Sequence, residues 1–143
     1  MANASILQRG TANLQSKRWN IFLWSAQVTL GGMFLMVGLM KMTTPIEVLV
    51  LKVPLAKDLP MLVRFIGVSE FAGALGLLLP SLLRIKPMLT SIAALGLVVV
   101  MILAGIFHLV RGEYPAIGFP IMFGLIAAFI AYGRTKKAPI APR

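Results

Sequence analysis

The sequence has no cysteine among its 143 residues, only four acidic residues and a single histidine. Without thiolates the chain can form no disulfide, no thiolate-ligated zinc or iron–sulfur site and no cysteine nucleophile. One histidine cannot supply both axial ligands of a haem, and Glu70 with His108 would give a metal ion only two ligands without the usual third. The sequence therefore encodes no cofactor and no metal site of its own.

Polar and charged residues are also scarce. Hydrophobic residues make up 59% of the chain and charged residues 13%, and the mean hydropathy is +0.91. A small soluble domain needs a mostly polar or mixed surface, so this composition favours an integral membrane protein whose partner is the lipid bilayer. The net charge of +10 does not indicate nucleic acid, because the 14 Lys and Arg residues are dispersed between apolar runs.

Four apolar runs are long enough to cross a membrane. A hydrocarbon core of about 30 Å needs about 20 helical residues, and runs that are continuous rather than alternating favour helices over barrel strands. The predicted spans are about 21–41, 61–80, 88–110 and 117–133. The sequence thus predicts an all-α fold, an antiparallel four-helix integral membrane bundle over residues 21–134.

Prolines mark the helix boundaries. Pro60 and Pro87 stand at the starts of the second and third spans, and Pro80 and Pro115 mark other ends, while Pro120 is either a first-turn residue or a mild kink. The segment between the first two spans is too charged and too rich in proline to cross the bilayer. We expect it to form a short segment at the membrane interface.

The distribution of positive charge predicts the topology. Residues 1–20 are polar and no cleavage site follows the first apolar run, so the first helix is expected to be an uncleaved anchor. Nine of the 14 basic residues lie on the side of the two termini, including the basic tail 135–143. The positive-inside rule then predicts a multi-pass protein of the inner (plasma) membrane with cytoplasmic termini.

Charged residues inside the predicted spans are the candidates for function. Glu70 lies about 13 Å into the second helix, where an ionised group costs about 2.5 to 3.5 kcal/mol unless it has a partner. Lys41 ends the first helix and His108 lies near the outer end of the third. Arg64 is expected to reach the outer interface rather than to pair with Glu70. We therefore predict a binding site formed by Lys41, Glu70 and His108.

Small residues accompany these polar side chains. Gly67 and Gly73 flank Glu70 at helical spacing, Gly38 shares a face with Lys41, and Gly105 lies beside His108. Small residues allow helices in lipid to approach closely. The pattern predicts that the three polar faces converge in the outer half of the bundle.

Three stretches taken together form a further pattern, namely Gly38 to Lys41, Ile66 to Pro80 and Ala104 to His108. A Lys after a Gly at the end of the first helix, a Glu in a Gly-rich second helix that closes with Pro, and a His late in the third resemble the DoxX-like family. The resemblance covers about Trp24 to Arg134 and implies a left-handed four-helix bundle. It implies differing roles, because relatives include a subunit linked to quinone-dependent thiosulfate oxidation, components of oxidant-resistance assemblies and assembly chaperones of ligand-gated channels.

Two interpretations of the polar residues remain. In the first, Lys41, Glu70 and His108 line a pocket that binds a small amphiphile such as a quinone, in a non-catalytic accessory subunit of a membrane redox assembly whose electrons come from a partner subunit. In the second, they only brace the bundle of a structural or chaperone-like partner of a larger membrane complex.

Overall fold

The computed structural model describes the backbone of residues 2–143 and the side chains of residues 14–143. Within this part the chain is helical and has no strand, which confirms the predicted all-α fold. The elements in chain order are α1 (Ala2–Thr43), α2 (Ile46–Lys52), α3 (Leu55–Asp58), α4 (Pro60–Leu83), α5 (Met88–Val110), η1 (Tyr114–Ile117), α6 (Gly118–Tyr132) and η2 (Gly133–Lys137).

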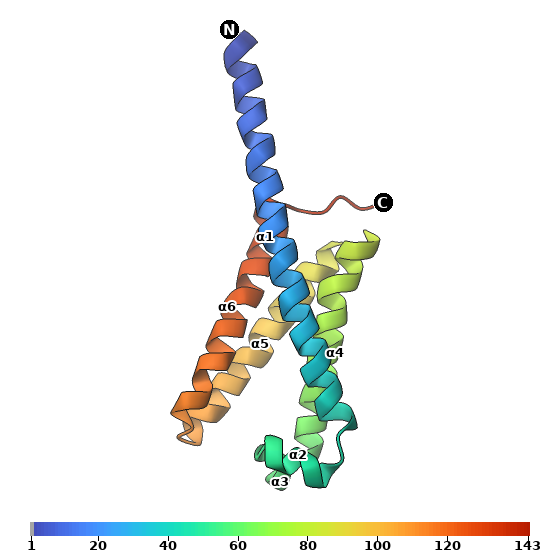
Figure 1. Ribbon diagram of the computed structural model, residues 1–143, viewed down its shortest axis with the longest axis vertical. Coiled ribbons are helices and arrows are strands. Elements are labelled where there is room, and N and C mark those ends of the chain that lie inside the picture. The colour runs from blue at the N-terminus through green and yellow to red at the C-terminus, as the bar shows by residue number, and fades with distance from the viewer. Residues whose placement is uncertain (1) are drawn as a thin grey trace.

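The long helices form an antiparallel bundle (Figure 1). The short helices α2 and α3 lie at one end, which we name the α2–α3 end. The opposite end, where α6 continues into η2, is the Arg134 end. Toward the α2–α3 end, the pair α5 and α6 diverges from the pair α1 and α4 (Figure 1).

Four helices of the described residues are long and apolar enough to cross a membrane, which supports a multi-pass membrane protein. These helices are Leu14–Thr43, Pro60–Leu83, Met88–Val110 and the joined helices from Tyr114 to Lys137. Their large apolar side chains remain exposed on the outside of the bundle, where lipid would cover them.

The helix boundaries differ from the predicted spans in two places. Helix α1 extends N-terminally through most of the segment 1–20, for which the sequence predicted only a polar segment. Helix α4 continues through Pro80 to Leu83, so Pro80 lies inside the helix and does not mark its end as the sequence predicted. Pro120 lies in the first turn of α6, where its missing N–H costs little.

The segment between α1 and α4 folds into the two short helices α2 and α3 and packs back onto the bundle. Leu49 of α2, Ala56 of α3 and Val63 of α4 form a small buried cluster that is separate from the main core. These apolar contacts hold the charged segment against the end of α4. The predicted interfacial segment is thus a helical cap over the α2–α3 end.

Glycines bring α1 and α4 into backbone contact. A Cβ on Gly38 would lie 2.8 Å from both the carbonyl oxygen of Gly67 and the amide nitrogen of Phe71. A Cβ on Gly67 would lie 2.7 Å from the Cβ of Lys41. Only glycine permits this approach, and it places the end of α1 against the first half of α4.

The other two predicted glycines have different surroundings. Gly73 faces α5, and an added Cβ would lie 2.6 Å from a methyl group of Leu97. Gly105 is less crowded, because the nearest atom to an added Cβ is the Cβ of Pro120 at 3.8 Å. Close helix packing therefore depends on Gly38, Gly67 and Gly73 more than on Gly105.

A buried polar network ties the helices together at the Arg134 end. The Gln27 side-chain amide donates to Ser81 Oγ at 3.2 Å, and the hydroxyls of Ser81 and Thr90 are 2.8 Å apart. Arg134 Nε donates to the side-chain oxygen Oε1 of Gln27, and Arg134 Nη1 donates to Asn20 Oδ1 at 2.7 Å. From the sequence, Arg134 was expected only to add to the positive charge on the side of the two termini. In the structure its side chain is buried and joins η2 to α1.

Candidate functional site

Two of the three predicted site residues, Lys41 and Glu70, form a direct ion pair. Lys41 Nζ donates to both carboxylate oxygens of Glu70, at 2.7 and 2.8 Å. The Glu70 side chain is 4% exposed and that of Lys41 15%. The contact follows from the close packing of α1 and α4 at Gly38 and Gly67, which brings the last turn of α1 against the middle of α4. The charge of Glu70 is therefore compensated where it lies far from water.

Arg64 does not pair with Glu70, as the spacing of the two residues predicted. Its guanidinium instead donates to the carbonyl oxygens of Lys41 and Thr44, the latter at 2.6 Å. These carbonyls lie at the end of α1, where the helix itself offers them no donor. Arg64 thus caps α1 and fixes the backbone that carries Lys41.

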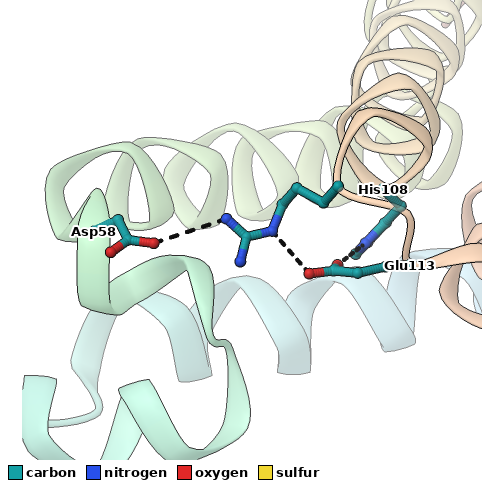
Figure 2. Close-up of polar contacts among 4 residues, drawn as sticks. Asp58, His108 and Glu113 are labelled. Carbon is teal, nitrogen blue, oxygen red and sulfur yellow. Dashed lines mark hydrogen bonds and ion pairs between the residues drawn. The ribbon is translucent and has the colours of Figure 1, made fainter.

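His108 has a partner that the sequence did not predict. Its Nδ1 lies 2.7 Å from Glu113 Oε2, in the turn that follows α5 (Figure 2). Gly112 has φ +71°, which reverses the chain so that the Glu113 amide donates to the His108 carbonyl at 2.9 Å. A separation of five residues is no helical spacing, so the pattern that located Glu70 could not locate Glu113.

Glu113 belongs to a chain of ionic contacts along the α2–α3 end. Arg111 Nε donates to Glu113 Oε1 at 2.8 Å, and Arg111 Nη1 lies 3.7 Å from Asp58 Oδ2 in α3 (Figure 2). The Arg111 guanidinium, together with the hydrogen bond to His108, holds the pKa of the Glu113 carboxyl below its ordinary range. Glu113 therefore stays ionised at mildly acidic pH.

A cavity of about 320 Å³ lies between α4, α5 and the segment before α3. Lys41, Glu70, His108 and Glu113 are its ionisable lining residues, and most of the rest is apolar. Apolar lining residues include Val53, Leu62, Ile66, Val100, Leu103 and Phe107. Such a volume with a few convergent polar groups has the character of a small-molecule site.

A second cavity of about 250 Å³ lies on the side of α1 and α6. Its lining shares Lys41, Glu70 and His108 with the first cavity. The three predicted residues are therefore brought together, although only two of them are in direct contact. They form the polar wall that both cavities share.

The charges around these cavities nearly cancel. Lys41 neutralises Glu70, and Glu113 lies between His108 and Arg111. An ammonium has three N–H donors, so Lys41 retains one after its two bonds to Glu70. Among the described residues no group of three His, Asp or Glu is placed to hold a metal ion. The wall can thus bond to a neutral polar group without taking up an extra charge.

In a comparison with protein-family models, residues 25–130 match the DoxX-like family. The match covers most of the chain and includes Lys41, Glu70 and His108, so the chain belongs to this family. No curated protein and no solved structure matches the sequence.

Proposed function

We propose that this member of the DoxX-like family is a non-catalytic membrane protein that binds the neutral polar head group of a small amphiphile, of which a quinone is one example. The observation that carries the proposal is the buried ion pair of Lys41 and Glu70 in the wall of a mostly apolar cavity of about 320 Å³. Ion pairs in lipid-embedded helices are rare and mark functional sites by default.

The chemistry of the cavity supports a neutral, amphiphilic ligand. An ionised head group would add a charge to a wall whose charges already cancel, and burying an unpaired charge is costly. A carbonyl head group can accept the third N–H of Lys41, and apolar surfaces of α4 and α5 can hold its hydrocarbon part. A quinone has this combination of carbonyls and an apolar tail.

The charge distribution indicates which half of the bilayer the site occupies. All four acidic residues of the sequence fall between residues 47 and 113, and Glu47, Asp58 and Glu113 lie at the α2–α3 end. Most of the basic residues belong to the Arg134 end. By the positive-inside rule the Arg134 end faces the cytoplasm of an inner membrane, so ligand binds in the outer half of the bilayer.

A second candidate function is favoured because the ion pair of Lys41 and Glu70 forms without a ligand. Both carboxylate oxygens of Glu70 already bond to Lys41 without any ligand. The pair would then serve only to fix the register of α1 against α4, in a structural or chaperone-like partner of a larger complex. Under this alternative the cavity has no ligand of its own.

Binding of a decyl-substituted benzoquinone separates the two functions. We expect the quinone to raise the melting temperature of the protein in detergent micelles, and Glu70→Gln to lose this response, because it removes the charge that orients Lys41. Glu47→Gln changes an exposed glutamate away from the cavity and is the matched control, which should respond as the native protein does. For each variant the response is the difference between its melting temperatures with and without the quinone.

No response of the native protein would contradict the binding function. An equal response of Glu70→Gln and the native protein would show that the quinone binds elsewhere, and the bracing function would then be the better account.

A further inference from the structure

We infer that Glu113 determines which head groups the site accepts, by holding His108 in the tautomer whose Nε2 is a hydrogen-bond acceptor. The inference rests on the proposed function, since it concerns the ligand of the same cavity. It makes Glu113 a positioning residue, because it acts on the ligand through the His108 ring.

The geometry fixes the roles of the two ring nitrogens. A carboxylate oxygen only accepts, so the 2.7 Å contact between Glu113 Oε2 and Nδ1 requires the proton to be on Nδ1. In a neutral imidazole the other nitrogen, Nε2, then carries a lone pair. Among the described residues no hydrogen bond to Nε2 is found, and His108 lines both cavities. Nε2 is therefore the ring atom left for a ligand.

The tautomer selects between two kinds of head group. With neutral His108, Nε2 accepts a hydrogen bond, which suits a hydroxyl such as that of a phenol or a hydroquinone. In the other neutral tautomer, with the proton on Nε2, the ring is a donor there, which suits a carbonyl such as that of a quinone. Loss of the Glu113 carboxylate should thus weaken the preference for a hydroxyl over a carbonyl.

The surroundings of His108 support this tautomer. Arg111 and His108 hold the pKa of the Glu113 carboxyl below its ordinary range, so Glu113 is ionised and accepts from Nδ1–H. On the side of α1 and α4, the charges of Lys41 and Glu70 cancel each other. Asp58 of α3 reaches His108 only through Arg111 and Glu113 (Figure 2). The Glu113 carboxylate is therefore the charged group in direct contact with the ring.

The test compares two stable probes, 4-decylphenol and a decyl-substituted benzoquinone, in lipid nanodiscs at pH 8. The quantity measured is the ratio of the quinone Kd to the phenol Kd, which cancels effects of tail partitioning. We expect this ratio to be about tenfold lower in Glu113→Gln than in the native protein, the equivalent of about 1.4 kcal/mol. The glutamine amide can either donate to Nδ1 or accept from it, so the variant no longer fixes the tautomer of His108.

Two further variants keep the test interpretable. Asp58→Asn breaks the outermost ion pair but leaves the contact between Glu113 and His108, so it should keep the native ratio. His108→Gln replaces the ring with an amide that can both donate and accept, so it should show the lowered ratio even if Glu113→Gln folds poorly.

The outcomes distinguish this inference from the proposed function. Failure of both probes to bind the native protein would overturn the proposed function and the inference with it. Binding of both probes with a native ratio in Glu113→Gln, or in His108→Gln, would overturn the inference alone.

Discussion

Replacing Glu70 with glutamine while Lys41 stays in place should lower the free energy of unfolding by about 3 kcal/mol. The variant leaves a largely buried ammonium without its counter-charge, and breaking a buried pair on one side typically costs about 3 to 5 kcal/mol. We place the effect at the lower end because Lys41 is 15% exposed and lies near the end of its helix. Equilibrium unfolding in detergent micelles measures it.

The double variant Lys41→Met with Glu70→Gln should recover much of this loss. It removes both charges, so neither partner remains buried and unpaired, and a double-mutant cycle isolates the coupling between them. Glu47→Gln, at an exposed site, should stay within about 0.5 kcal/mol of the native protein. Strictly additive losses from the two single variants would mean that the pair has no coupling energy.

Replacing Gly38 with alanine should lower the free energy of unfolding by about 2 to 3 kcal/mol. The new Cβ would lie 2.8 Å from two backbone atoms of α4, and backbone atoms cannot rotate away as a side chain can. The helices must separate, with the usual cost of overpacking. The separation would also disturb the contact of Lys41 with Glu70, so the variant should lose quinone binding.

Gly32→Ala is the matched control on the same helix. Nothing lies within 4 Å of a Cβ at Gly32, so the substitution should stabilise α1 slightly, by up to about 1 kcal/mol, through helix propensity. The same unfolding assay serves for both alanine variants. Equal effects of the two substitutions would contradict a backbone contact between α1 and α4 at Gly38.

Sequence reasoning located the parts of the molecule that depend on periodicity and on the thickness of the bilayer. Apolar runs of bilayer length predicted the four long helices. The depth of Glu70 and the glycines beside it predicted that a cation from a neighbouring helix would meet it, and Lys41 does. Gly38 and Gly67 follow the same rule, because close helix packing in lipid needs small residues.

The parts that the sequence did not reveal depend on chain reversal and on contacts between distant segments. Glu113 reaches His108 only because Gly112 adopts a positive φ, which no spacing rule anticipates. Arg134 resembles any basic residue near a helix end, yet its side chain is buried against Gln27, 107 residues away in the sequence. In both cases the tertiary partner, rather than the local pattern, determines the role of the residue.

The central claim is that the neutral polar head group of an amphiphile binds at the wall formed by Lys41, Glu70 and His108, and photolabelling with 4-decylbenzophenone tests it most directly. The probe carries a neutral carbonyl, an apolar tail and its own photoreactive group. We predict labelling of the lining segments 62–70 and 100–108, and competition by excess decyl-substituted benzoquinone. Labelling spread over lipid-facing residues such as Ile92 and Ile121, with no competition, would contradict the claim.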